Sequence, residues 1–287
     1  MKIASIDIGT NAIKSKVFNT SPTTIDFIEG IRSPIRLGAE VFGTGLLSDN
    51  KLNELIRTLV KYQDNFLKNN IKMYEIVATS AFRDTANSEN ARRYVENNIN
   101  HPIRIISGLE EAKLIRFHPK AQEGKNKIYV DVGGGSTEIY IYKNGDHIIQ
   151  SFQLGAVRSM LGKDDKNEWL RLSEWLNKQS DIDTLIGLGG SIKSFLNIYK
   201  CKQITSDLFI EKSKELTTLN QEEKISQFKL QPDRADVIDY ALKIYLMIIN
   251  KLDIKNIKST KWGVSDSIAV KTFHELYSKK YQSIKTR

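Results

Sequence analysis

Cysteine is nearly absent from this sequence of 287 residues, in which Cys201 is the only one. One thiol cannot form an intramolecular disulfide, and it has no second thiol with which to hold a metal ion. Long apolar runs are missing too. No stretch approaches the roughly 18 apolar residues that cross a bilayer, and Asp7 stands where a signal peptide would have its apolar core. We therefore expect a soluble protein of the reducing cytoplasm that acts without a membrane.

Two common nucleotide-binding motifs are also absent. The sequence contains neither the G-x-x-x-x-G-K-[ST] pattern of P-loop proteins nor the G-x-G-x-x-G pattern of dinucleotide-binding folds. The formal net charge is +9, but lysines and arginines are spread along the chain without a basic block, so no specific nucleic acid is expected as a partner. The basic balance either favours other polyanions, such as polyphosphate or nucleotides, or reflects general lysine usage.

The sequence does contain an internal repeat. Residues 4–18 (ASIDIGTNAIKSKVF) align with residues 128–142 (IYVDVGGGSTEIYIY) at an offset of 124 residues, which superposes Asp7 on Asp131. Each copy reads as a strand, a polar turn and a second strand, and helices and strands follow both. Repetition at matched places indicates a duplicated unit. We expect two similar α/β domains, 1–121 and 122–287, with the last helix able to return to the first domain.

Three glycine-rich turns follow strands in this pattern. DVGGGST (131–137) joins two strands, DIGTN (7–11) does so in the first copy, and GLGGS (187–191) leads from a strand into a helix. Glycine lets the backbone approach a ligand and aim successive N–H groups at an anion, as a helix N-terminus also does. One such cluster is more often a tight turn, but three at matching places favour phosphate binding. We expect the two strand–turn–strand loops to bind one phosphate chain from opposite sides of a cleft between the domains, with the third turn as a further candidate.

Charged residues stand close to these turns. Asp131 and Glu138 could hold a divalent cation, because Mg²⁺ is commonly bound by one or two carboxylates with water and phosphate oxygens. The alternatives are a turn-starting aspartate and an exposed strand residue. Arg83 follows an expected buried strand over 74–81, where it could bind phosphate or form a surface ion pair with Asp84.

Two adjacent acids, Glu110 and Glu111, open a helix expected to begin at residue 108. Both could be surface acids favoured by the helix macrodipole. Alternatively, one turns inward as the general base for a water molecule, since hydrolysis at phosphorus needs an oriented nucleophile.

Taken in order, the motifs resemble those of the exopolyphosphatase / guanosine pentaphosphate phosphohydrolase family. The resemblance implies an α/β fold of two duplicated ribonuclease H-like domains with an interdomain cleft, as in the actin–hexokinase–Hsp70 superfamily, in its short two-domain form. The matching segments are SIDIGTNAIK (5–14), ATSAFRD (78–84), ISGLEEAKL (106–114), DVGGGSTEI (131–139), LGAVR (154–158), GLGGSIKS (187–194) and, more weakly, DRADVI (233–238) and VSDS (264–267).

The resemblance also implies a role for each matching residue. Glu111 falls on the family's proposed general base, and Arg83 falls on an arginine that contacts the phosphate chain. Asp131 and Glu138 fall on the acids associated with Mg²⁺ or another divalent cation. Ala12 departs from the family, which commonly has a hydroxyl there. The other expected phosphate ligands are Thr10, Asn11, Lys14 (where arginine is frequent), Gly133, Gly134, Gly135, Ser136, Thr137, Gly189, Gly190 and Ser191.

The implied activity is hydrolysis of a terminal phosphoanhydride, which releases orthophosphate from inorganic polyphosphate. A guanosine pentaphosphate 5′-phosphohydrolase is the close alternative. A non-catalytic sensor of polyphosphate or a nucleotide is also open, because the first loop is altered. An ATP-dependent kinase is disfavoured, since a water-activating glutamate suits hydrolysis. The sequence leaves chain-length preference and formation of a homodimer undecided.

Overall fold

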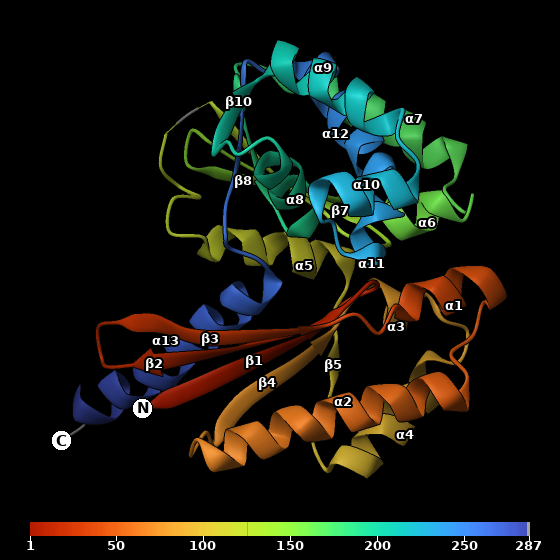
Figure 1. The fold of residues 1–287 in the computed structure, drawn as a ribbon. Helices are drawn as coiled ribbons and strands as arrows, with labels where there is room; N and C mark the ends of the chain where they lie inside the picture. Colours follow the sequence, from red (N-terminus) through yellow and green to blue (C-terminus); the bar gives the residue numbers. More distant parts are fainter. Residues whose placement is uncertain (125, 286–287) are drawn as a thin grey trace. The chain divides into compact units, whose positions relative to one another are not determined.

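The chain forms two compact units in the computed structural model, which describes residues 1–124 and 126–285, with side chains up to Tyr277. The first unit comprises Met1–Ser107 and the C-terminal helix from Val264, and the second comprises Gly108–Gly263. Each contains one sheet with helices packed on it (Figure 1).

The sheet of the first unit has five strands in the order β3-β2-β1-β4-β5. Strands β1, β2 and β3 form an antiparallel meander, whereas β4 runs parallel to β1 and β5 runs parallel to β4. The bounds are β1 Lys2–Ile8, β2 Ile13–Thr20, β3 Ile25–Ser33, β4 Met73–Ala78 and β5 Arg104–Ile105.

The sheet of the second unit repeats this arrangement and adds an edge strand. Its order is β8-β7-β6-β9-β11-β10, with β6 to β8 antiparallel, β9 and β11 parallel to β6, and β10 antiparallel to β11. The bounds are β6 Lys127–Val132, β7 Thr137–Lys143, β8 Asp146–Phe152, β9 Thr184–Leu188, β10 Gln203–Thr205 and β11 Asn256–Ser259. The predicted duplicated α/β fold of ribonuclease H-like units is therefore confirmed.

Both faces of the first sheet are covered. Ile3–Ile8 of β1 are buried without interruption, and successive side chains of a strand point to opposite faces. On one face Ile3 and Phe18 pack with Ala269 and Phe273 of α13. Helices α2 and α4 pack against each other in the same unit (Figure 1). The helices are α1 Leu37–Thr44, α2 Asp49–Lys68, α3 Ser80–Asp84, α4 Ser88–Ile99 and α13 Val264–Lys285.

Helix α2 illustrates how local sequence sets these elements. Ser48 caps it by accepting a hydrogen bond from the Lys51 N–H at 3.3 Å. Its buried residues, spaced three or four apart, form one apolar stripe: Leu52, Leu55, Leu59, Tyr62 and Phe66.

The helices of the second unit flank its sheet. Helix α12 is the most buried of them, with residues such as Ile244, Tyr245 and Ile248 almost inaccessible. The bounds are α5 Gly108–Leu114, η1 Ile115–Phe117, α6 Ala156–Met160, α7 Lys166–Leu176, α8 Gly190–Ile198, α9 Ser206–Thr217, α10 Gln221–Phe228, α11 Pro232–Ala235 and α12 Ile238–Leu252. None of the helices in the described part of the chain is long and apolar enough to cross a membrane.

The units differ in their bounds from the expected division 1–121 and 122–287. Residues 108–121 belong to the second unit, because α5 packs on β7 and β8. Helix α13 belongs to the first unit, as the expected return of the last helix allowed, and it packs there on β1, β2 and β4. A smaller difference is that β4 ends at Ala78 and Ser80 opens α3, so the strand expected over 74–81 is shorter.

Candidate active site

The first glycine turn joins β1 to β2. The Gly9 N–H donates to the Ala12 carbonyl at 3.2 Å and closes the turn. The carbonyls of Thr10 and Asn11 accept from the N–H groups of Gly38 and Arg36 at 2.8 and 3.1 Å. Within the described residues the Thr10 N–H donates to no acceptor. The turn is thus held through its carbonyls, and an amide stays available to an anion.

The second turn repeats this design at the same offset. The Gly133 N–H donates to the Ser136 carbonyl at 2.9 Å. The Gly134 carbonyl accepts from the N–H groups of Val157 and Arg158 at 2.8 and 2.9 Å. In the part of the chain that the structure describes, the N–H groups of Gly134 and Gly135 donate to nothing. Two adjacent amides can therefore bind an anion here.

Residues from the start of α6 hold the second turn rigidly. The Arg158 Nε donates to the Gly135 carbonyl at 2.8 Å. A Cβ atom on Gly155 would lie 2.5 Å from the backbone of Gly135, so only glycine permits this approach. The Thr137 hydroxyl donates to the Leu154 carbonyl at 2.6 Å, and Thr137 is fully buried. Thr137 thus anchors the turn, and its hydroxyl proton is already used.

The third turn lies beside Asp131. Gly189 has a left-handed φ of 79°, and a Cβ atom there would lie 2.6 Å from Asp131 Oδ1. Gly190 packs against the guanidinium of Arg234. Strand β9 runs parallel to β6 with Leu188 opposite Asp131, which accounts for this proximity. The second and third turns therefore meet around one carboxylate within the second unit.

Asp131 and Glu138 are directly opposite each other on β6 and β7, so their side chains share one face of the sheet. Glu138 is 2% exposed, which excludes the alternative of an exposed strand residue. The Ser151 hydroxyl donates to Glu138 Oε1 at 2.9 Å. Burial is the main cause that raises the pKa of the Tyr245 phenol well above its usual value, and the charge of Asp131 raises it further.

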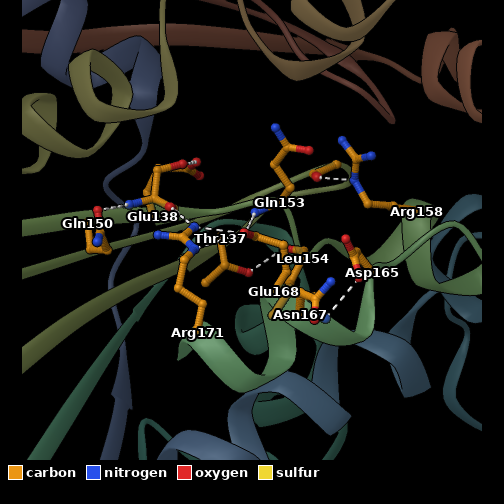
Figure 2. Close-up of polar contacts among 12 residues, drawn as sticks. Thr137, Glu138, Gln150, Gln153, Leu154, Arg158, Asp165, Asn167, Glu168 and Arg171 are labelled. Atoms are coloured by element: carbon orange, nitrogen blue, oxygen red, sulfur yellow. Dashed lines mark hydrogen bonds and ion pairs between the residues drawn. The ribbon is translucent and has the colours of Figure 1, made fainter. Parts of the chain in front are cut away.

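A further arginine supports the strand that holds Ser151. The Arg171 Nη2 donates to the Ser151 carbonyl at 2.6 Å, and its guanidinium lies over the Phe152 ring at 4.3 Å. Arg171 also binds Glu168, and this hydrogen bond is the main reason why the pKa of Glu168 is lowered (Figure 2). These contacts hold β8 in place, and they thereby position the Ser151 hydroxyl that donates to Glu138.

The two carboxylates fit a hard divalent cation such as Mg²⁺. Mg²⁺ usually binds one or two carboxylates and completes its coordination shell with water and phosphate oxygens. The structure offers two carboxylates on one sheet face next to available amides. No group of three or more histidine, cysteine, aspartate or glutamate side chains suited to a metal occurs among the described residues. The donor set therefore suits a cation shared with a phosphate ligand better than an all-protein metal site.

Helix α5 begins beside these carboxylates. Gly108, its first residue, packs against the Ser151 side chain and lies close to Glu138. Glu110 is exposed, whereas Glu111 is half-buried. Of the two adjacent acids, Glu111 is therefore the less exposed, and it belongs to the same unit as Asp131 and Glu138.

In the first unit the equivalent strand positions hold an ion pair. The Lys14 Nζ lies 3.4 Å from Asp7 Oδ2, and Asp7 is 3% exposed. Burial raises the pKa of Asp7, and Lys14 offsets part of this effect. Lys16 pairs with Asp266 of α13 at 2.5 Å, and the Ser5 hydroxyl donates to the Ser265 carbonyl at 2.7 Å. The VSDS segment thus ties α13 to this sheet.

Arg83 lies in α3 of the first unit. Its Nη1 donates to the Ile106 carbonyl at 2.7 Å, and its Nε lies 3.9 Å from Asp84 Oδ1. The ion pair with Asp84, which the sequence offered as an alternative, is therefore present, although its two atoms are far apart for an ion pair.

Comparison with known proteins now identifies the family. Residues 5–166 match the model of the Ppx/GppA phosphatase family. The chain belongs to this family. It is accordingly an enzyme of the phosphoanhydride hydrolase type.

Solved structures agree in fold. An exopolyphosphatase from Cytophaga hutchinsonii superposes with a TM-score of 0.84 at 17% identity, covering 96% of this chain and 98% of that one. A Ppx/GppA family member from Aquifex aeolicus superposes with a TM-score of 0.74 at 23% identity, covering 99% of this chain and 98% of that one. At these identities the likeness concerns the fold.

Several residues around the Ppx/GppA site were not among the predicted site residues. Arg158, Gly155 and Arg234 lie in the matching segments LGAVR and DRADVI, so a signal was present in the sequence. Ser151 and Arg171 lie outside every motif. Their contacts with Glu138 and β8 arise only from strand pairing and helix packing.

Proposed function

We propose that this Ppx/GppA protein removes the terminal phosphate of inorganic polyphosphate by hydrolysis, with Mg²⁺ as its cation. The observation that carries the proposal is the pair Asp131 and Glu138. Glu138 is 2% exposed and lies directly opposite Asp131, so two carboxylates of one sheet face offer the oxygen ligands that Mg²⁺ prefers. Available amides of the Gly133–Ser136 turn lie at the end of the same two strands. A cation bound by the two carboxylates and a phosphate bound by the amides would account for both features.

Asp131 and Glu138 would hold the cation. When bound, Mg²⁺ offsets the charge of the terminal phosphates and of the phosphate that leaves. Ser151 would keep the Glu138 carboxylate in position through the hydrogen bond at 2.9 Å.

The phosphate groups would be bound by the glycine turns. We assign the Gly134 and Gly135 amides to the terminal phosphates, and Gly189, Gly190 and Ser191 to the same chain. Thr10, Asn11, Lys14 and Arg83 of the first unit are further proposed ligands. Lys14 would exchange its 3.4 Å contact with Asp7 for a phosphate oxygen.

Glu111 would act as the general base. It takes a proton from water, the water oxygen forms a bond to the terminal phosphorus, and the bond from that phosphorus to the bridging oxygen breaks. The products are orthophosphate and a chain shorter by one phosphate. The half-buried position of Glu111 in α5, beside the residues that support Glu138, favours it over the exposed Glu110.

The deciding experiment compares phosphate release from long polyphosphate, tripolyphosphate and guanosine pentaphosphate in the presence of Mg²⁺ and of EDTA. We expect Mg²⁺-dependent release with the highest kcat/KM on long polyphosphate, because a net charge of +9 favours the longer polyanion. Preference for guanosine pentaphosphate would replace polyphosphate as the substrate. Tight binding without release from any of the three would overturn the hydrolase and favour a sensor.

A further inference from the structure

A cavity of about 370 Å³ lies in the second unit, apart from the carboxylates described above. One wall is the C-terminal part of α8, from Ser194 to Ile198, together with Lys200 just after the helix. The other wall is the segment 227–234, which connects α10 to α11. All three helices carry labels in Figure 1.

The side chains that line this cavity are basic or neutral. Lys200, Lys229 and Arg234 contribute positive charge, and amides such as Asn197 and Gln231 supply further hydrogen-bond donors. No carboxylate is among the lining residues of this described region. Lys200 and Lys229 are exposed, and neither side chain makes an ion pair or hydrogen bond within the described residues. The cavity therefore has the charge and donors that an oxyanion requires.

Both lysines occupy a left-handed backbone conformation, with φ of 52° at Lys200 and 54° at Lys229. Outside glycine this conformation is uncommon, and asparagine and aspartate adopt it most readily. Of the eight such residues in the described chain five are asparagine or aspartate, and two of the other three are these lysines. On backbone grounds asparagine would fit both positions better than lysine does.

The backbone between α10 and α11 adds further donors. Phe228 ends α10 in a right-handed conformation, and Lys229 follows in a left-handed one. Such a pair turns successive N–H groups toward one side and forms an anion-binding concavity. The N–H groups of Leu230 and Gln231 donate to no acceptor in the described part of the chain.

A simpler account is that each lysine offsets the partial negative charge at a helix C-terminus, since α8 and α10 both end at this cavity. Arg234 lies in the last turn of α11 and also lines the cavity, but its guanidinium has a second neighbour besides that helix end. The Arg234 guanidinium packs against Gly190 of the third glycine turn. One side chain thus connects the cavity to a turn assigned to phosphate binding.

We propose that this cavity binds the part of a polyphosphate chain that lies away from the hydrolysed end. Lys200, Lys229 and the Leu230 amide hold its phosphates, and Arg234 lies between them and the Gly189–Ser191 turn. The identity of the ligand rests on the proposed function, whereas binding itself can be measured without turnover.

The test is a double substitution, Lys200→Asn with Lys229→Asn, made in the Glu111→Gln background and measured with EDTA present. Asparagine keeps the left-handed conformation and removes both charges. We expect long polyphosphate to bind on the order of tenfold more weakly, with the salt dependence of log Kd reduced by about one to two, as for two lost phosphate contacts. Tripolyphosphate should lose less affinity than the long chain.

Two controls isolate the cavity. Lys166→Gln with Lys178→Gln removes the same charge from exposed positions at the two ends of α7 and should leave the affinity unchanged. Lys200→Arg with Lys229→Arg should bind as the parent does. Unchanged affinity in the asparagine variant, with or without a lower Tm, would overturn the proposal, as would an equal loss in the α7 variant. Because no turnover enters this assay, failure of the hydrolase proposal gives a different result, namely absence of phosphate release.

Discussion

The two glycine turns of this protein share a backbone design but differ in charge. In both, the first glycine N–H closes the turn onto the carbonyl three residues later, at 3.2 Å in Gly9 and 2.9 Å in Gly133. The acid before each turn is also retained. Its partner across the strands is Lys14 in the first unit and Glu138 in the second.

This single difference separates two kinds of site. Asp7 and Lys14 neutralise each other at 3.4 Å, so the first hairpin needs no added cation. Asp131 and Glu138 are two acids at directly opposed positions, where the first hairpin instead has an acid and a lysine. The two hairpins therefore share a turn backbone, and one strand position distinguishes them in charge, with Lys14 in the first copy and Glu138 in the second.

The largest effect is expected from Glu111 of α5, the helix that packs on β7 and β8 of the second unit. Glu111→Gln should lower kcat by about 10²- to 10⁴-fold, because a general base contributes that factor. Polyphosphate binding should persist. Glu110→Gln, one residue away and exposed, is the matched control and should stay within a few-fold of the parent. Steady-state phosphate release measures both, and equal loss in the two variants contradicts the assignment.

The second prediction concerns a substitution that gives the second hairpin the charges of the first. Glu138→Lys gives β6 and β7 the charge pattern of β1 and β2, and Asp131 gains the kind of partner that Lys14 provides to Asp7. We expect the protein to fold and Mg²⁺-dependent activity to fall about 100-fold or more. Magnesium titration calorimetry should show no binding. Full Mg²⁺-stimulated activity in this variant would falsify the cation site, and Glu138→Asp serves as the control that keeps the carboxylate.

A third prediction compares the residues that brace each turn. A Cβ on Gly155 would meet the Gly135 backbone at 2.5 Å, which cannot rotate away. A Cβ on Gly38 would instead meet the Thr10 side chain. Gly155→Ala should therefore lower the free energy of unfolding by about 1–3 kcal/mol, and Gly38→Ala by less. Urea denaturation measures both, and the reverse order would show that the second turn adapts more easily than its contacts indicate.

The smallest effect is a pH dependence in the first unit. Burial raises the pKa of Asp7 above its ordinary value of 3.8, with Lys14 as the largest opposing influence. The charged carboxylate is thus less favourable in the folded chain than in the unfolded chain. The contribution of Asp7 to stability is present below pH 3.8 and is lost as pH rises through the raised pKa.

Asp7→Asn should remove this dependence. Its free energy of unfolding relative to the parent should shift in favour of the variant as pH rises from about 4 toward neutrality, and then level off. Urea denaturation across this range checks the trend, with the exposed Asp26→Asn as control. A difference that shrinks with rising pH would mean that the lysines, and not burial, dominate at Asp7.

Much of the fold and part of the site could be predicted from the sequence. The strand–turn–strand copies at an offset of 124 residues, the glycine turns and the family motifs are local patterns, and local backbone preference and hydrogen bonding shape them directly. Glu111, Asp131 and Glu138 could be named as candidates for the same reason.

Only the tertiary structure decided which candidates come together. It placed residues 108–121 with the second unit and buried Glu138. It packed Gly189 against Asp131 and gave the Thr137 hydroxyl the Leu154 carbonyl as its acceptor. It also paired Lys16 with Asp266, which lies 250 residues further along the chain. Such outcomes depend on which distant surfaces exclude water from each other. Sequence periodicity shows that a face is apolar or a turn is tight, but not what covers it.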